Sequence, residues 1–206
     1  MSSISFIGLG GMTRAIATRA LAAGHPVELV GRDAAKATDL AVTLGDGATT
    51  APFGAAPAGD IVILAVPFTG AIDVVTQYGD ALADKIVIDI SNTFNEDASG
   101  VVTPDGTSGA QLIAHAAPSS TRIIKAFNTV FGHVLTSDRT LDVLFAGDDA
   151  DAKATVSAFI ESLGLRPFDV GGLAMARWLE AAGPLLMGLA QNGAGFDIAL
   201  RVEQVA

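Results

Sequence analysis

The chain has 206 residues, half of them hydrophobic, and carries a formal charge of −10 at pH 7. This length suits one well-buried domain with an extension and is short for two full domains. The negative charge argues against a nucleic-acid partner, whose phosphates need a basic surface, and the absence of cysteine excludes disulfides and thiolate chemistry.

The mean hydropathy of +0.48 is high and raises the question of a membrane segment. The longest uncharged stretches, residues 61–72 and 181–196, are shorter than a membrane span needs and are interrupted by proline and glycine. The first residues, Met-Ser-Ser-Ile-Ser, lack the basic start and the cleavage site of a signal peptide. We therefore expect no transmembrane helix, no membrane partner and a cytoplasmic protein.

Residues 4–17 pass from a short apolar strand through a glycine-rich turn into apolar residues at helical spacing. Gly8 permits the tight turn, and Gly10, without a Cβ, lets the backbone approach a pyrophosphate at the positive end of the helix. Thr13 stands where glycine or alanine is usual, so the helix either lies further from the sheet or the hydroxyl contacts phosphate. The pattern predicts a dinucleotide site made of Gly8, Leu9, Gly10, Gly11, Met12 and Thr13.

The end of the second predicted strand, residues 27–30, indicates which dinucleotide is bound. An NAD site carries an acid for the ribose near residue 30, but the chain has Val30 and Gly31 there, followed by Arg32. Arg32, with Lys36 one helical turn later, suits a 2′-phosphate, because a guanidinium forks onto phosphate while stacking on adenine. The alternative is two solvated charges at a helix start. Gly31, Arg32 and Lys36 thus predict NADP as the cofactor.

The rest of the chain alternates helix and strand signals. Helices are predicted at 34–44, 68–78, 111–117, 149–163 and 173–191, and strands at 48–52, 60–67, 85–90, 122–127, 140–146 and 166–170. With the first two strands this predicts an α/β, doubly wound, mostly parallel eight-stranded sheet covered on both faces. Residues 1–170 form the predicted NADP-binding domain, and residues 171–206 a C-terminal helical extension of the same unit.

Ligands of open α/β sheets lie at the carboxyl ends of the strands, so residues there are candidates for the cofactor's path toward its nicotinamide. Ala65, Val66 and Pro67 close the buried fourth strand and are expected to form a backbone wall. Asn92 follows the fifth strand in a polar turn, where it could bond ribose or carboxamide, although such a turn needs no ligand to explain it.

The sixth strand leads into a segment that carries the candidate catalytic residues. Asn128 and Thr129 are predicted to orient the nicotinamide carboxamide or the acceptor ring, and Ala126 and Asn128 to contact the cofactor. His133 could bond a substrate or donate a proton, or be structural. Hydride transfer between stacked rings needs no strong acid or base, and the chain carries no convincing carboxylate pair or metal-binding pattern.

Five motifs of the chain, taken together in their order and spacing, indicate a known family. They are Ile7-Gly8 to Met12, Gly31-Arg32 with Lys36, Ala65-Val66-Pro67, Lys125-Ala126-Phe127-Asn128-Thr129, and Leu179-Glu180 before Pro184-Leu185-Leu186. On these motifs the chain resembles the NADPH:coenzyme F420 oxidoreductase family, whose fold also forms the nucleotide-binding domain of certain membrane metalloreductases. The resemblance covers almost the whole chain, with Thr13 as a departure from the glycine pattern. It implies an eight-stranded Rossmann-like fold, NADP(H), and hydride transfer with a deazaflavin- or flavin-like acceptor.

Other functions share parts of these signals. Hydroxy-acid dehydrogenases and pyrroline-carboxylate reductases have the same glycine pattern but append a large helical domain, whereas only residues 171–206 follow the eighth predicted strand. The chain could also reduce another small molecule, or serve as a non-catalytic NADPH-sensing module. Polar and aromatic residues between Phe127 and His133 exceed what nucleotide binding needs, and they favour an enzyme.

The last predicted helix, residues 173–191, is apolar over more than one face. A helix that covers only its own sheet needs one apolar stripe, so the excess predicts a homodimer, as the resemblance also implies. Gly183 and Pro184 are expected to kink this helix, and Trp178 to lie near the cleft or the interface.

Overall fold

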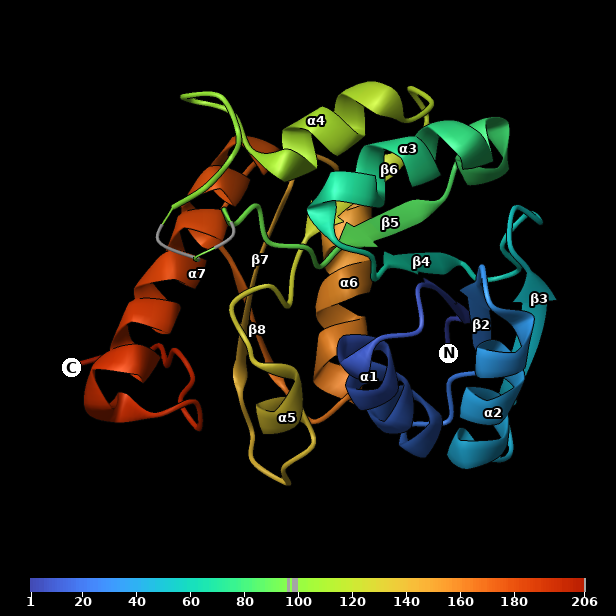
Figure 1. Cartoon of the computed structure of the whole chain (residues 1–206), viewed down its shortest axis with the longest axis horizontal. Helices are drawn as coiled ribbons and strands as arrows, with labels where there is room; N and C mark the ends of the chain where they lie inside the picture. Colours follow the sequence, from blue (N-terminus) through green and yellow to red (C-terminus); the bar gives the residue numbers. More distant parts are fainter. Residues whose placement is uncertain (96, 98–99, 206) are drawn as a thin grey trace.

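A computed structural model describes residues 1–95, 97 and 100–205. Its centre is an eight-stranded sheet of order β3-β2-β1-β4-β5-β6-β7-β8 (Figure 1). The six parallel strands are β1 (Ile4–Ile7), β2 (Val27–Gly31), β3 (Ala48–Pro52), β4 (Ile61–Leu64), β5 (Ile86–Asp89) and β6 (Arg122–Lys125). The remaining strands are β7 (Asp142–Gly147), antiparallel to β6, and β8 (Arg166–Asp169), parallel to β7.

Helices cover both faces of this sheet. They are α1 (Gly11–Ala22), α2 (Ala34–Leu44), α3 (Phe68–Tyr78), α4 (Gly109–Ala116), α5 (Gly132–Leu135), α6 (Ala150–Ser162) and α7 (Ala176–Leu189). Alternate strand residues point to opposite faces: Phe6 and Ile63 pack toward α1 and α6, and Val62 and Leu64 toward α3 and α4. The predicted α/β, doubly wound, Rossmann-like fold with a mostly parallel eight-stranded sheet is confirmed.

Most predicted boundaries lie within two residues of the observed ones, but β4 ends at Leu64, three residues earlier than predicted. α4 begins at Gly109, two residues earlier than predicted, because Ser108 and Gln111 form a capping box. The single helical turn α5 and the 3-10 turn η1 (Gly79–Leu82) were not predicted, since neither is long enough to show a period. Residues 96 and 98–99, between β5 and α4, lie outside the described residues.

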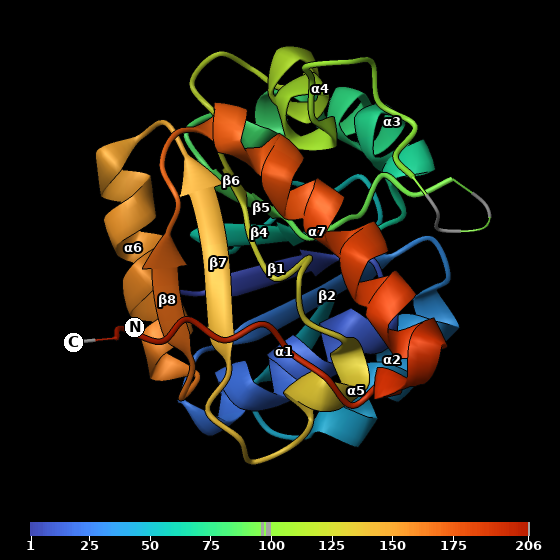
Figure 2. The ribbon, with the colours of Figure 1, turned by 90° about the vertical axis from the view of Figure 1, so that its left-hand side faces the viewer.

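α7 crosses the molecule from the α4 side to the α5 side (Figure 2). The predicted helix over 173–191 consists of the 3-10 turn η2 (Leu173–Met175), α7 and the π-helical turn η3 (Ala190–Ala194). α7 stays helical across Pro184, and non-helical backbone angles occur only later, at Asn192 and Gly193.

One face of α7 is buried against the rest of the molecule, through Ala176, Leu179, Glu180, Gly183 and Leu186. Leu189, three residues after Leu186, is 47% exposed. Among the described residues, no helix is both long and apolar enough to cross a membrane.

Candidate functional site

The glycine-rich turn joins β1 to α1, and the two ends of this turn differ in why they need glycine. Gly8 has a φ of +118°, and a Cβ on it would lie 2.1 Å from the carbonyl oxygen of Ala65 at the end of β4. Both the left-handed backbone and this close approach exclude a side chain. Gly8 is thus required by the fold itself, because the backbone of Ala65 lies directly against it.

Gly10 lacks any such requirement. It precedes α1 with an ordinary φ of −87°, and a Cβ at Gly10 or at Gly11 would meet no atom within 4 Å. Neither backbone conformation nor packing explains these two glycines. The open space in front of the α1 N-terminus is what the backbone needs in order to approach a pyrophosphate, so the turn fits a dinucleotide.

Thr13 is fully buried in the first turn of α1. Its Oγ1 donates to the carbonyl oxygen of Gly8 at 2.8 Å, and this hydrogen bond stabilises the turn. Of the two alternatives for Thr13, this geometry argues against a phosphate contact as donor, because the single hydroxyl proton is already donated within the chain.

A cavity of about 320 Å³, termed the β2 cavity, lies on one side of the turn. Residues predicted from three different strand ends meet there, and those that line it are Gly8, Leu9, Gly31, Arg32, Lys36, Val66 and Pro67. A Cβ on Gly31 would lie 2.3 Å from Leu9 Cδ1, so this glycine leaves room for the Leu9 side chain.

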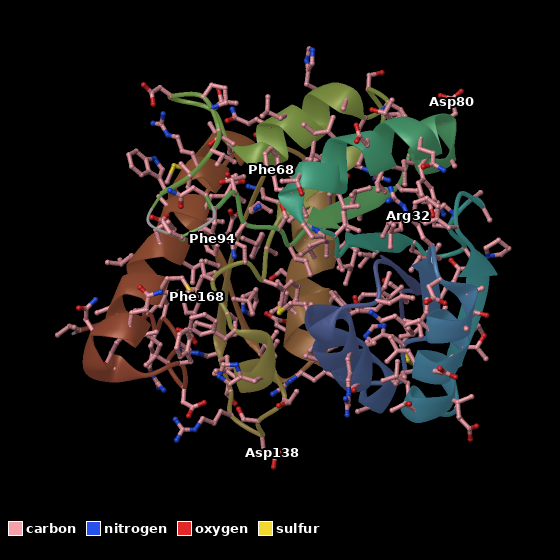
Figure 3. All side chains as sticks on the ribbon, viewed as in Figure 1. Arg32, Phe68, Asp80, Phe94, Asp138 and Phe168 are labelled. Carbon is pink, nitrogen blue, oxygen red and sulfur yellow. The ribbon has the colours of Figure 1, made fainter. Side chains whose placement is uncertain are left out.

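Arg32 is the main positive group of the β2 cavity, and Figure 3 shows it well away from Phe94, which lies near α7. Its guanidinium lies 5.3 Å from the Phe53 ring centroid, and Phe53 packs edge-on against Tyr78 at 5.6 Å. Burial raises the pKa of the Tyr78 phenol, whose oxygen accepts from the Gly54 N–H at 3.0 Å. Among the described residues no carboxylate forms a salt bridge with Arg32, which leaves its charge available for an anion.

A second cavity, termed the β6 cavity, lies on the other side of the turn and has a volume of about 200 Å³. It is lined by Met12, Asn92, Phe94, Asn128, Thr129, Val130, Phe131, Gly132, Gly183, Leu186 and Met187. Leu9 faces the β2 cavity and Met12 the β6 cavity, so the glycine turn separates the two. Ala126, also predicted to contact the cofactor, is fully buried and lines neither cavity.

Asn92 and Asn128 bond to each other in the wall of the β6 cavity. Asn128 Nδ2 donates to Asn92 Oδ1 at 3.0 Å and to the Leu179 carbonyl at 2.8 Å, while Asn92 Nδ2 donates to the Asn128 carbonyl at 3.1 Å. Among the described residues, Asn128 Oδ1 and Thr129 Oγ1 are buried without a hydrogen-bond partner. An unpaired buried polar atom costs about 1–3 kcal/mol, so these atoms suit a ligand with donor groups, such as a carboxamide.

His133 lies outside the β6 cavity. Its side chain is 51% exposed, and its Nε2 lies 3.0 Å from the carbonyl of Phe196 and 3.2 Å from a carboxylate oxygen of Asp197. The ring stacks on Phe131 at 5.8 Å. Of the alternatives left open for His133, these contacts favour the structural one, because α5 turns its side chain toward the C-terminal segment.

A buried charge cluster that was not predicted from the sequence lies next to the β6 cavity. Lys125 Nζ lies 2.8 Å from Asp89 Oδ2 and 3.0 Å from Glu180 Oε1, and it donates to the Ser91 carbonyl at 2.6 Å. These residues come from β6, β5, α7 and the turn after β5. The signal available was a charged residue at the end of each of two strands with apolar interiors, Asp89 after Ile86–Ile88 and Lys125 after Ile123–Ile124. No group of histidine or acidic side chains in the described part of the chain could hold a metal ion.

Comparison with known proteins gives related matches. Residues 3–93 match the family described as NADP oxidoreductase, coenzyme F420-dependent. The chain is 30% identical over 186 residues to rat metalloreductase STEAP3, covering 86% of this chain and 36% of that protein. It is 31% identical over 143 residues to the F420-dependent NADP reductase of Methanocaldococcus jannaschii, and this match covers 66% of this chain and 64% of that protein. The chain thus spans about a third of the first relative and just under two thirds of the second.

A solved structure shares the fold over the full length. A protein of Arthrobacter sp. FB24, provisionally assigned as an F420-dependent NADP-reductase, superposes with a TM-score of 0.88. The match covers 99% of this chain and all of that one at 22% identity, which is evidence for a common fold.

The two glycines of the turn give a matched pair of variants. Gly8→Ala is expected to lower the free energy of unfolding by about 2 kcal/mol or more, because its Cβ meets the Ala65 carbonyl at a positive φ. Gly10→Ala should change stability by less than about 0.5 kcal/mol but weaken NADPH binding by about 1–3 kcal/mol, since its Cβ points into the open space. Urea unfolding and NADPH titration measure both; unchanged NADPH affinity in Gly10→Ala would contradict the site.

Proposed function

We propose that this member of an F420-dependent NADP oxidoreductase-like family, an NADP-dependent oxidoreductase, transfers hydride between NADPH and a deazaflavin- or flavin-like acceptor. The observation that carries the proposal is the pair of cavities on either side of one glycine turn. The β2 cavity offers an unpaired cation, and the β6 cavity offers apolar walls with unpartnered polar atoms.

Each part of the proposed cofactor has matching residues. The backbone N–H groups at the start of α1 would hold the pyrophosphate, because Gly10 and Gly11 have no side chains that would block access to them. Arg32 and Lys36 would hold the 2′-phosphate, with the guanidinium fork supplying paired hydrogen bonds. Asn128 would orient the carboxamide through its free Oδ1.

When bound, NADPH supplies a hydride, which carries two electrons, and the acceptor takes up one further proton from water to complete its reduction. The chain's part in this step is to hold two rings in contact and to keep water out of the space between them. Asn128 and Thr129 would orient the rings. Water would be excluded by the apolar side chains of the cavity wall, which are Phe94, Phe131, Leu186 and Met187. This work requires no strong acid or base, which agrees with a cavity wall of amides, a hydroxyl and apolar groups.

The proposal includes a homodimer formed through α7, in a cytoplasmic protein with no nucleic-acid partner. Met175, Trp178, Leu185 and Leu189 are exposed, and their spacing of three, seven and four residues places them on one face of the helix. An apolar stripe of this kind is typical of a helix that pairs with another. Residues 171–206 would then form the extension that carries this interface and one wall of the β6 cavity.

The proposed reaction is tested by following NADPH oxidation with a panel of acceptors: a deazaflavin, riboflavin, FMN and a ferric chelate. We expect steady oxidation with the deazaflavin or the flavins. NADPH binding without turnover on any acceptor would instead support a non-catalytic NADPH-sensing module, and oxidation with the ferric chelate alone would indicate a different acceptor class.

Arg32 is expected to set the choice of nucleotide. Arg32→Ser should weaken NADPH binding by about 1.5–3 kcal/mol, the range for hydrogen bonds to a charged group, while NADH binding changes little. Titration of both nucleotides measures the ratio of their affinities. Arg14→Ser, on the exposed part of α1, serves as the control. An unchanged NADPH to NADH ratio in Arg32→Ser would contradict the assignment.

The dimer is tested with a charge placed in the exposed stripe. Wild-type protein should sediment as a dimer at micromolar concentration, and Leu185→Lys as a monomer of 20.8 kDa, because burying an unpaired ammonium in an apolar interface is unfavourable. Val42→Lys, at an exposed apolar residue of α2, should remain dimeric. A monomeric wild-type protein with full activity would show that α7 does not pair.

A further inference from the structure

The β6 cavity is lined by uncharged side chains only, among the residues that the structure describes. Its polar groups are Asn92, Asn128 and Thr129, and the rest of its wall is apolar or glycine. Its volume of about 200 Å³ is below the range of about 300–1,000 Å³ that is usual for sites enclosing a whole small molecule. The cavity therefore suits an uncharged ring, with any charged part of the same molecule lying outside.

Gly183 gives this cavity its shape. It lies within α7, where glycine weakens a helix and therefore calls for a reason. A Cβ on Gly183 would lie 2.3 Å from Cε1 and 2.5 Å from Cζ of Phe94, and 3.2 Å from Oδ1 of Asn92. The missing side chain thus allows the Phe94 ring to lie against α7, where Figure 3 places it. Gly188, on the same helix, has nothing within 4 Å of such a Cβ.

Resting on the proposed function, we infer that Gly183 and Phe94 together determine acceptor specificity by setting the width of the β6 cavity for a flat, uncharged ring. A Cβ on Gly183 has to displace Phe94, because the atoms it meets are the far end of a side chain that can rotate, whereas the α7 backbone is fixed by its buried face. The ring lines the cavity, so its displacement changes the space left for the acceptor. The same Cβ would also lie close to Asn92 Oδ1 and would therefore crowd the hydrogen-bonded Asn92–Asn128 pair.

The test compares four variants with wild type: Gly183→Ala, the control Gly188→Ala, Phe94→Ala, and the double variant Gly183→Ala with Phe94→Ala. The probes are riboflavin and 5-deazariboflavin, whose rings are uncharged, and their dissociation constants are measured by fluorescence with saturating NADP⁺. The NADPH dissociation constant and the thermal midpoint are measured for each variant, which separates cavity shape from cofactor binding and folding.

Gly183→Ala is expected to raise the dissociation constant of both rings by about tenfold or more, with a much smaller loss of NADPH affinity, because the proposed phosphate contacts lie at the glycine turn and the β2 cavity. Gly188→Ala should bind like wild type. In the double variant, ring affinity should return to that of Phe94→Ala alone, because the Cβ then has no ring to displace. Unchanged ring affinity in folded Gly183→Ala would overturn the inference. So would a double variant that binds the rings more weakly than Phe94→Ala does, by the same factor that separates Gly183→Ala from wild type.

Phe94→Trp provides a second route if Gly183→Ala does not fold. The larger ring fills the cavity from the opposite side and should cause the same loss of ring affinity with α7 unaltered; wild-type affinity in this variant would overturn the inference. Turnover is scored separately. A wild type that binds both rings without oxidising NADPH contradicts the proposed function alone, whereas a wild type that binds neither ring contradicts the inference.

Discussion

The buried ammonium of Lys125 is the interaction on which this end of the molecule depends. Its three donors meet three acceptors, on Asp89, Glu180 and the Ser91 backbone, so it joins β5, β6 and α7. Two carboxylates against one cation leave a formal excess of one negative charge. Glu180 offsets this by accepting from the N–H groups of Gly109 and Ala110 at the start of α4, where the helix dipole favours an anion. Buried charges are tolerated only when paired and hydrogen-bonded in this way.

The cluster also fixes the wall of the β6 cavity. The carbonyl of Leu179, the neighbour of Glu180, accepts from Asn128 Nδ2, so the same turn of α7 is attached both to β6 and to the segment that follows it. Between Lys125 and Asn128, Phe127 has a φ of +62°, which is rare for a bulky residue. Such backbone persists only when its surroundings over-determine it. Asn128 is thereby held with its Nδ2 satisfied and its Oδ1 left without a partner.

Local patterns were enough to predict most of the fold and several of the residues that line the β2 cavity. The glycine turn, the Gly31-Arg32 pair and the periodicity of α2 and α3 are each encoded within a few residues. The Lys125 cluster was not predictable in the same way, because its partners lie 36 and 55 residues away and only the fold brings them together. Likewise, Pro184 does not break α7, since Leu179 and Leu186 bury the helix on both sides of it. The position of His133 depended on α5, whose four residues carry too little pattern to predict.

Charge is divided between the two cavities in a way that follows from what each would hold. A phosphate is recognised by exposed cations, and Arg32 and Lys36 supply them in a chain whose formal charge is −10. A wall that faces a ring losing hydride has the opposite requirement, because a nearby cation would oppose the positive charge that develops there. The β6 cavity meets this requirement: Lys125, the cation next to it, is fully buried and outnumbered by its two carboxylate partners, so the groups that face the cavity are neutral oxygens and apolar surfaces.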